Sequence, residues 1–525
     1  MLGKGSGMLA SRRAWMVRAT LAGLCGLLLT ASLLGASKTS AQTPKPVASS
    51  NSNTSFTLVS AKDGSLRRQQ VADMIAGLRV VNYYPAANGW TLMWTNWQPA
   101  VINSDFAKIR NLGANTVRVI VFPSVFGWPT TSSTMAARFA DMLAMAAANG
   151  LGVQLTLFDW WGGYSEISQS RTWLSSLLQP YRTDPEIRMV ELQNEVDPAD
   201  AAQVAWLRAL LPTLRSVMPQ TPITVSVSGT EGPAGFTQLL SELDGAPLDV
   251  ADMHYYGSEG SAYGWMLAAK QAAGSLPLFV GEIGDAVTDD GAGLQAAELD
   301  QAYWYQVVFA AARAAGVPAP APWILNDFEP TAIPGGSTPE QYDFGLYTTA
   351  GQPLPAAAVV RDAFTGQPSD ISNLDFSLAG ENGLPMLWST SLPAQGVLAY
   401  DATVGYQHPG SVSLSATQLS PLGAPSFYLV PVNPAISGQL WNVNVWAKGV
   451  DVNGTAQLAL AWFNSAGEFL GNSNSPALQQ GNPGWTDLLV SARVPAEATS
   501  VQIVLKSYDV AGTVWFADAQ IAVSP

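Results

Sequence analysis

Cysteine and histidine are almost missing from this chain of 525 residues, which contains one Cys and two His. One cysteine cannot form a disulfide framework, and so few thiols and imidazoles exclude a zinc site built from clusters of Cys and His. Charged residues are also scarce, at 12%, whereas hydrophobic residues make up 48%. This composition excludes an intrinsically disordered chain and supplies enough apolar side chains for a large core.

Positive charge is the scarcer sign, because 25 Lys and Arg stand against 39 Asp and Glu, which gives a net charge of −14. A nucleic-acid-binding protein needs a basic surface, so this class of partner is excluded. The chain is instead rich in carboxylates and in aromatic residues, with 18 Trp and 15 Tyr. Flat aromatic faces beside carboxylates suit the binding of sugars.

Residues 1–41 have the pattern of a secretory signal. A basic start containing Arg12, Arg13 and Arg18 precedes an apolar stretch, and small residues follow up to Ala41. We expect cleavage after Ala41 and bacterial-type export, to the periplasm, the cell surface or the medium. A membrane anchor is the weaker alternative, because the stretch is short and interrupted by Gly, Thr and Ser, and we expect no stable span after cleavage.

Residues 70–365 alternate short apolar runs with helical patterns, after a linker and N-terminal segment at 42–69. The runs are nearly continuous in apolar residues, as expected of parallel strands covered on both faces. Eight such runs predict an α/β fold, a (β/α)8 TIM barrel. The alternative is a doubly wound open sheet, but the first run is not followed by a glycine-rich phosphate loop. The runs are Leu78–Tyr84, Thr116–Phe122, Gly152–Trp160, Ile187–Glu195, Ile223–Ser228, Asp249–Tyr256, Pro277–Gly284 and Pro322–Phe328.

Several segments between these runs have clear helical patterns. Two of them end at glycines, Gly150 and Gly316, which commonly stop helices. The helices predicted most clearly are Ser133–Asn149, Ala201–Met218, Phe236–Leu243 and Leu294–Ala315.

The chain changes character after residue 365. Residues 366–372 resemble a linker, and helical periodicity is lost beyond them. Short alternating segments separated by Gly, Pro and Asn then predict an all-β, jelly-roll-like sandwich over residues 373–525. These segments are Ser411–Thr417, Gln439–Lys448, Ala456–Asn464, Thr486–Val494, Ser500–Tyr508 and Thr513–Ala522.

Chemically useful residues stand at the carboxyl ends of the predicted barrel strands, where barrel enzymes place their active sites. The fourth and seventh strands lie three apart around the ring, so Glu195 and Glu282 are expected to face each other across the barrel mouth. The other strand-end residues are Arg118 on the second strand, His254 and Tyr256 on the sixth, and Trp323 on the eighth.

Two facing carboxyl groups can cut a glycosidic bond. In a retaining hydrolysis, one carboxylic acid protonates the leaving oxygen while the other group attacks the anomeric carbon and forms a covalent glycosyl-enzyme. The two groups are then about 5–5.5 Å apart, whereas an inverting enzyme needs roughly 6.5–9.5 Å.

These motifs make residues 75–365 similar to clan A of the glycoside hydrolases, and most similar to family 5, the cellulase and mannanase family. The resemblance implies that Glu195 is the acid/base, that Glu282 is the nucleophile and that no cofactor is required. It also implies roles for the other matched residues: Asn194 at the sugar 2-hydroxyl, His254 and Tyr256 in the substrate site, Arg118 beside the nucleophile, and Trp323 as the floor of the central subsite.

The sequence departs from family 5 after the third strand. Members of the family usually carry a His there, whereas this chain has Asp159, Trp160 and Trp161. Asp159 is a candidate to replace the hydrogen bonding of that His, and the two tryptophans are candidates to shape the subsite.

The C-terminal sandwich resembles carbohydrate-binding modules, and a stabilising appendage is the alternative. Sandwiches of this kind often hold a structural Ca²⁺, for which Asp375 and Asp518 are candidate ligands. The candidate sugar platforms are Trp441, Trp446, Trp462, Trp485 and Tyr508.

We therefore predict a secreted retaining β-glycoside hydrolase that acts on β-linked polysaccharide or oligosaccharide of the glucan or mannan type. A transglycosylase is the close alternative, because sugar can replace water in the second step. A non-catalytic polysaccharide-binding or cell-wall protein is the alternative from another class.

Overall fold

The computed structural model describes residues 64–289, 293–367, 373–379, 383–391, 396–416, 424–429, 433–465 and 467–524. The predicted signal at 1–41 lies outside the described residues, as does most of the predicted linkers at 42–69 and 366–372. Within the described part of the chain, no helix is long and apolar enough to cross a membrane.

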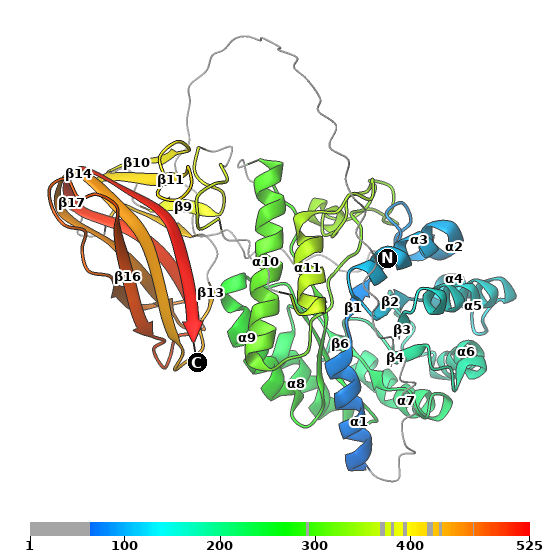
Figure 1. Cartoon of the computed structure of the whole chain (residues 1–525). Coiled ribbons are helices and arrows are strands. Elements are labelled where there is room, and N and C mark those ends of the chain that lie inside the picture. The colour runs from blue at the N-terminus through cyan, green and yellow to red at the C-terminus, as the bar shows by residue number, and fades with distance from the viewer. Residues whose placement is uncertain are drawn as a thin grey trace, which may run out of the picture. The chain divides into compact units, whose positions relative to one another are not determined.

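Parallel strands alternate with helices from residue 80 onward, which confirms the predicted (β/α)8 barrel (Figure 1). The first five strands form one parallel sheet in chain order, and the next three form another. Val225 separates β5 from β6, so these two short strands together fill the fifth position of the barrel. The strands are β1 (Val80–Asn82), β2 (Thr116–Ile120), β3 (Gly152–Thr156), β4 (Ile187–Glu191), β5 (Ile223–Thr224), β6 (Ser226–Val227), β7 (Ala251–Tyr255) and β8 (Leu278–Ile283).

The eighth position is filled by residues 321–325. The backbone N–H of Asn82 donates to the carbonyl of Pro322 (3.1 Å), which joins this segment to β1. The N–H of Trp323 donates to the carbonyl of Ile283 (2.7 Å), which joins it to β8. The predicted eighth strand is therefore a closing segment held by isolated bridges, without regular pairing along its predicted length.

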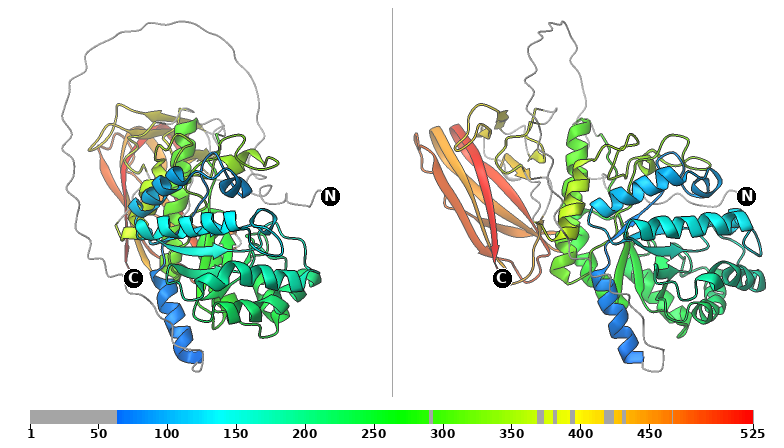
Figure 2. Two further views of the ribbon diagram at one scale, coloured as in Figure 1. Left: turned by 90° about the vertical axis from the view of Figure 1, so that its right-hand side faces the viewer. Right: turned by 45° about the vertical axis from the view of Figure 1, so that its right-hand side comes forward.

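The helices lie around these strands, and the predicted helical patterns agree closely with α5, α7, α8 and α10. Figures 1 and 2 show α10 and α11 side by side, where Phe309 packs edge-on against Phe364 at 5.8 Å. The helices are α1 (Gly64–Gly77), α2 (Thr91–Thr95), α3 (Pro99–Asn111), α4 (Pro123–Phe126), α5 (Ser133–Ala148), α6 (Ile167–Leu178), α7 (Ala201–Val217), α8 (Gly232–Leu243), α9 (Ala262–Ala273), α10 (Leu294–Ala315) and α11 (Pro355–Thr365).

Helix α1 covers the end of the barrel at which the strands begin. The guanidinium of Arg67, on α1, donates two hydrogen bonds to the carboxylate of Asp249, which lies just before β7. Both N···O distances are 3.0 Å. Arg215 from α7 donates to the same carboxylate. The apolar face of α1 packs on residues from the strand starts, so the base of the barrel is closed and the opposite end carries the site. This cluster contains Val71, Met74, Ile75, Leu78, Val80, Met189, Val250, Phe279 and Ala321.

The C-terminal part is an antiparallel β-sandwich, as predicted. Two long strands, β14 and β17, run through it, and each joins two segments that the sequence pattern separated. Register shifts between residues 444 and 455 explain the difference, because a bulge interrupts the alternation of side chains while the strand continues. The strands are β9 (Trp388–Ser391), β10 (Gly396–Asp401), β11 (Ser411–Ala416), β12 (Ser426–Leu429), β13 (Asn433–Pro434), β14 (Leu440–Phe463), β15 (Phe469–Asn474), β16 (Thr486–Arg493) and β17 (Ser500–Ser524).

Candidate active site

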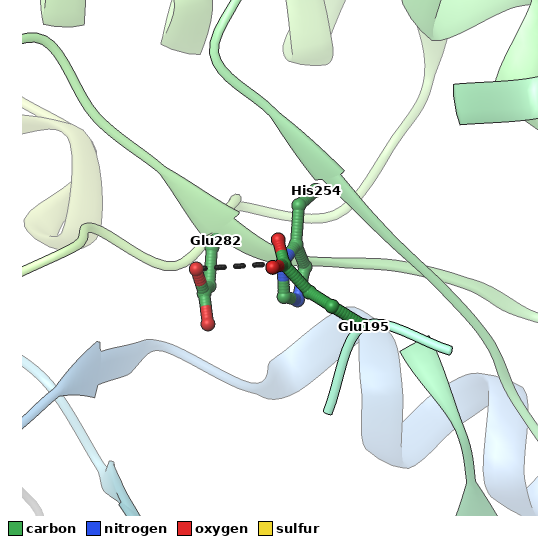
Figure 3. A group of neighbouring side chains, drawn as sticks. All are labelled: Glu195, His254 and Glu282. Carbon is green, nitrogen blue, oxygen red and sulfur yellow. Dashed lines mark hydrogen bonds and ion pairs between the residues drawn. The ribbon is translucent and has the colours of Figure 1, made fainter. Parts of the chain in front are cut away.

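Glu195 and Glu282 meet at the carboxyl end of the barrel. Glu195 lies in the turn after β4, with a positive φ of 45°, and Glu282 lies in β8. His254, on β7, stands beside both, and Figure 3 shows the three side chains converging. One ligand atom from each of the three lies within 4.8 Å of the other two, so the glutamate carboxyl groups approach within this distance.

Glu282 is buried and surrounded by hydrogen-bond donors. Arg118 Nη1 donates to Oε1 (2.5 Å), and the hydroxyl of Tyr256 donates to Oε2 (2.6 Å). Burial by itself raises the pKa of Glu282, but the charges of His254 and Arg118 and the hydrogen bond from Tyr256 outweigh it, so the pKa is lowered. Glu282 is therefore held as a carboxylate, which is the form a nucleophile needs.

Arg118 connects Glu282 to the barrel interior. Its side chain is fully buried and donates to four further groups: Asn82 Oδ1 (2.8 Å), Thr156 Oγ1 (2.9 Å), Glu191 Oε2 (2.9 Å) and Asn194 Oδ1 (2.7 Å). Sequence reasoning did not select Asn82, Thr156 or Glu191. Each of the three is a polar residue at the last position of its strand, so the strand-end position that selected Glu195 and Glu282 could have found them as well.

His254 supplies a second positive charge. Its Nδ1 lies 2.9 Å from Glu195 Oε1 and 3.4 Å from Glu282 Oε2. Burial by itself lowers the pKa of His254. The negative charge of Glu282 and the hydrogen bond to Glu195 have the larger, opposite effect and raise the pKa to about 9. The imidazole is therefore protonated at neutral pH and donates from Nδ1.

The same three side chains are the candidate metal ligands in the described part of the chain. A cation there would have to compete with two charges that already face Glu282, the guanidinium of Arg118 and the protonated His254. This donor set therefore fits acid–base chemistry better than metal binding.

Glu195 has the more open environment of the pair. Its side chain is 29% exposed, against 6% for Glu282. Its backbone N–H donates to Ser226 Oγ on β6 (2.9 Å), which fixes the turn. Two carboxyl groups in such different surroundings are suited to different roles, one as a permanent anion and one as a proton carrier.

Asp159 lies beside this group, where the sequence departs from family 5. Asn194 Nδ2 donates to its Oδ1 (3.5 Å). Burial raises the pKa of Asp159 to about 7, against the opposing effects of the Arg118 charge and the N–H of Trp160. The structure thus brings Asp159 together with Asn194. Because burial raises the pKa of Asp159 to about 7, its carboxyl group gains or loses a proton near neutral pH.

The predicted aromatic residues fall into two groups. Trp160 is 57% exposed and stacks on Trp90 (5.8 Å between ring centroids), and Trp323 meets Trp90 edge-on (6.0 Å). Trp161 packs instead against Trp128 (4.4 Å). Trp160 and Trp323 therefore share an aromatic wall that also includes Trp90, while Trp161 belongs to a separate cluster.

The candidate calcium ligands of the sandwich accept hydrogen bonds from the protein. Asp375 Oδ1 accepts from the N–H of Ser377 (3.1 Å), and Asp518 Oδ2 accepts from the N–H of Gln407 (2.7 Å). The calcium site stays a prediction from sequence.

Residues 81–323 match the family model described as Cellulase (glycosyl hydrolase family 5). This range contains Arg118, Glu195, His254 and Glu282. The match confirms the predicted resemblance of this part of the barrel to family 5. No curated protein sequence matches the chain.

Solved structures similar to this chain include the exo-beta-1,4-mannosidase Op5Man5 from Opitutaceae bacterium strain TAV5. The identity is 20% and the TM-score 0.45, over 55% of this chain and 59% of that one. A GH5_18 variant from Streptomyces cattleya, in complex with Manb1-4GlcNAc, has 18% identity and a TM-score of 0.46, over 55% of this chain and 80% of its own. The b-glucuronidase from Ruminococcus gnavus has 15% identity and a TM-score of 0.41, over 51% and 46%.

Proposed function

We propose that this protein, whose barrel matches glycosyl hydrolase family 5, is an exported retaining β-glycoside hydrolase acting on β-linked glucan or mannan. One observation carries the proposal. Glu195 and Glu282 approach within 4.8 Å, and Glu282 is the one buried among Arg118, His254 and Tyr256, whereas the side chain of Glu195 is 29% exposed. This spacing agrees with the roughly 5–5.5 Å of retaining enzymes and is shorter than inverting enzymes need.

In the first step, the carboxylate of Glu282 attacks the anomeric carbon while the carboxylic acid of Glu195 gives its proton to the leaving oxygen. The bond from carbon to the leaving oxygen breaks, and a glycosyl ester of Glu282 forms. Arg118 and Tyr256 hold the two oxygens of Glu282, so the attacking group is oriented before substrate arrives.

In the second step, Glu195 acts as a base. Glu282 has lost its negative charge in the ester, which makes ionisation of Glu195 easier. Glu195 then takes a proton from water, the hydroxide oxygen attacks the anomeric carbon, and the ester bond to Glu282 breaks. A sugar hydroxyl in place of water gives transglycosylation. Neither step needs a cofactor.

The first test is reducing-sugar release from a panel of β-glucans, mannans and xylans. We expect release by the wild type, loss of about 10³-fold or more in Glu282→Gln, and full activity in the control Glu242→Gln, whose side chain is half exposed. No release from any member of the panel, or equal release by Glu282→Gln, would count against the proposal.

Azide separates the roles of the two carboxyl groups. In Glu282→Ala, azide takes the place of the nucleophile and attacks a β-glycoside directly, so an α-glycosyl azide is expected. In Glu195→Ala, azide attacks the glycosyl-enzyme of a substrate with a good leaving group, so a β-glycosyl azide is expected. The opposite pair of products would reverse the assigned roles.

The sandwich has a surface suited to polysaccharide. Tyr406 stacks on Trp446 (3.9 Å) and meets Trp485 edge-on (5.9 Å), while the ammonium of Lys448 lies over the rings of Trp485 (4.9 Å) and Trp515 (5.2 Å). We call these five residues the aromatic patch. Two of the predicted platforms, Trp446 and Trp485, belong to it.

Two other predicted platforms do not reach the surface. Trp441 and Trp462 are 4% and 2% exposed and belong to the core of the sandwich. Trp441 alternates with partly exposed residues along β14, whereas Trp462 ends a stretch of five buried residues, so both pack in the core and neither is a binding platform. The aromatic patch, with flat rings and one cation, is the part of the sandwich that we assign to binding neutral polysaccharide.

Binding by the aromatic patch is tested by pull-down of the full chain, carrying Glu282→Gln, on insoluble β-glucan and mannan. We expect Trp446→Ala to weaken retention by about fivefold or more, because an aromatic platform contributes about 1 kcal/mol or more. The control Phe469→Ala removes an exposed ring elsewhere (58% exposed) and is expected to bind normally. Equal retention of both variants would leave the sandwich as an appendage.

Export rests on the N-terminal pattern described above. N-terminal sequencing of the protein collected from outside the cytoplasm is expected to begin at Gln42. An intact Met1 in the exported fraction, or retention inside the cell, would contradict it.

A further inference from the structure

β8 contains a bulge immediately before Glu282. In the register of β7 and β8, Met253 faces Val280 and His254 faces Glu282, so Gly281 is one residue extra. An extra residue twists a strand locally and re-aims the side chain that follows it. The direction of Glu282 therefore depends on how the peptide groups of Gly281 are held.

Two side chains hold those peptide groups. The N–H of Gly281 donates to Asp252 Oδ1 (3.0 Å), and Asn82 Nδ2 donates to the carbonyl of Gly281 (3.0 Å). Asn82 also accepts from Arg118 Nη1 through its Oδ1 (2.8 Å), and the same nitrogen donates to Glu282. The side-chain amide of Asn82 thus holds the backbone just before Glu282 directly and the carboxylate of Glu282 through Arg118. Asp252 holds the N–H of the bulge from the other side.

Asp252 is closely fitted to this position. It is fully buried, and a Cβ added to Gly281 would lie 2.4 Å from its Oδ1. Burial, and next the charge of Glu191, raise the pKa of Asp252 well above its usual range. Its Oδ1 accepts the amide hydrogen of the bulge, and the amide oxygen of an Asn in its place would keep that acceptor.

We infer that Asp252 is a positioning residue, which holds the Gly281 bulge so that Glu282 points at the anomeric carbon. This inference rests on the proposed role of Glu282 as nucleophile. Asp252 has no place in the chemical steps themselves. Its effect is on geometry, where a displacement of about 1 Å can cost 10²-fold in rate.

The test uses the full chain and an aryl β-glycoside that the wild type cleaves. We expect Asp252→Ala to lower kcat by about 10²-fold and to change KM by less than about threefold, since it misplaces the nucleophile without removing a substrate contact. We expect Asp252→Asn to stay within about threefold of wild-type kcat, because its amide oxygen accepts the same hydrogen. Melting temperatures confirm that each variant is folded at the assay temperature.

Gly281→Ala tests the contact from the other side. In the wild-type background it is expected to lower kcat by about 10²-fold, because the new methyl group displaces Asp252. In the Asp252→Ala background it is expected to add less than about threefold, because the three atoms nearest to the added Cβ all belong to Asp252. Gly77→Ala, where an added Cβ meets nothing within 4 Å, is the matched control.

Three results would overturn the inference: wild-type kcat in folded Asp252→Ala, equal losses in Asp252→Asn and Asp252→Ala, or additive losses in the double variant. If Asp252→Ala does not fold, the kcat values of Asp252→Asn and Gly281→Ala test the inference instead. A near-normal Asn variant with a kcat-deficient Gly281→Ala supports the inference, and any other pair contradicts it. A wild type that cleaves no glycoside would instead overturn the proposed function.

Discussion

Arg118→Met is the substitution whose effect on stability follows most directly from the structure. Arg118 Nη2 lies 2.7 Å from Glu191 Oε2 and Nη1 lies 2.5 Å from Glu282 Oε1. Methionine fills much of the space of the arginine stem but leaves two buried carboxylates without their shared cation.

The expected loss in the free energy of unfolding comes from leaving these two carboxylates buried without a cation. Removing one partner of a buried ion pair typically costs about 3–5 kcal/mol, and here two carboxylates lose the same partner. The side chains of Glu191 and Glu282 are 0% and 6% exposed, so water replaces little of the lost interaction. A loss of this size lowers the melting temperature of a domain of this length by roughly 10 °C.

Chemical denaturation of the full chain at pH 7 measures the loss, with Arg361→Met as the control. Arg361 is 53% exposed and pairs with Asp362, so its removal is expected to cost less than about 0.5 kcal/mol. The lowered pKa of Glu282 contributes stability that is present above its unfolded value and is lost as the pH falls through the folded value. The difference between wild type and Arg118→Met should therefore shrink as the pH falls.

Arg118→Lys adds a readout in activity. Lysine keeps one positive charge but cannot reach every partner of the guanidinium, so the pKa of Glu282 rises and the acid limb of the kcat profile moves to higher pH. A loss in Arg118→Met below about 1 kcal/mol, or one equal to that of Arg361→Met, would refute the reasoning.

Two further substitutions have pH-dependent outcomes, both measured by chemical denaturation between pH 3 and 8. Asp159 has a folded pKa of about 7, above the ordinary 3.8, so its contribution to stability is present below the unfolded value and is lost as the pH rises through the folded one. Asp159→Asn should therefore gain up to about 4 kcal/mol relative to wild type as the pH rises from 4 to 7.5, and a constant difference would contradict this. Asp249 is the reverse case, because Arg67 and Arg215 lower its pKa against the effect of burial, so its contribution is lost as the pH falls. Asp249→Asn should cost about 3 kcal/mol at pH 7, less below pH 4, and leave kcat and KM unchanged, since it lies at the base of the barrel.

Local sequence patterns were sufficient for most of the barrel. The helix predicted over Leu294–Ala315 is α10 with the same bounds, because apolar spacing and a glycine that adopts a positive φ after the last turn are both local signals. The eighth strand was harder, because residues 321–325 are held by bridges to β1 and β8 that no local pattern encodes. β14 and β17 were divided for a related reason: bulges break the alternation that defines a strand in sequence.

The same division applies to the site. The sequence by itself determined which residues stand at strand ends, and this was enough to select Glu195 and Glu282, since barrel topology brings the ends of parallel strands to one face. Closure of the barrel decided the rest. It brought the two carboxyl groups within 4.8 Å of each other and buried Asp252 against Gly281.

Distance and burial are properties of neighbours that lie far apart in the chain. Asp252 and Gly281 are 29 positions apart, and Arg118 and Glu282 are 164 apart, so only the folded ring brings them within hydrogen-bond distance. The pKa of a carboxyl group depends on that enclosure, which residue type alone does not specify. Periodicity thus predicted the fold and the two glutamates that stand at strand ends, and the tertiary structure decided that Glu282 is the one kept ionised.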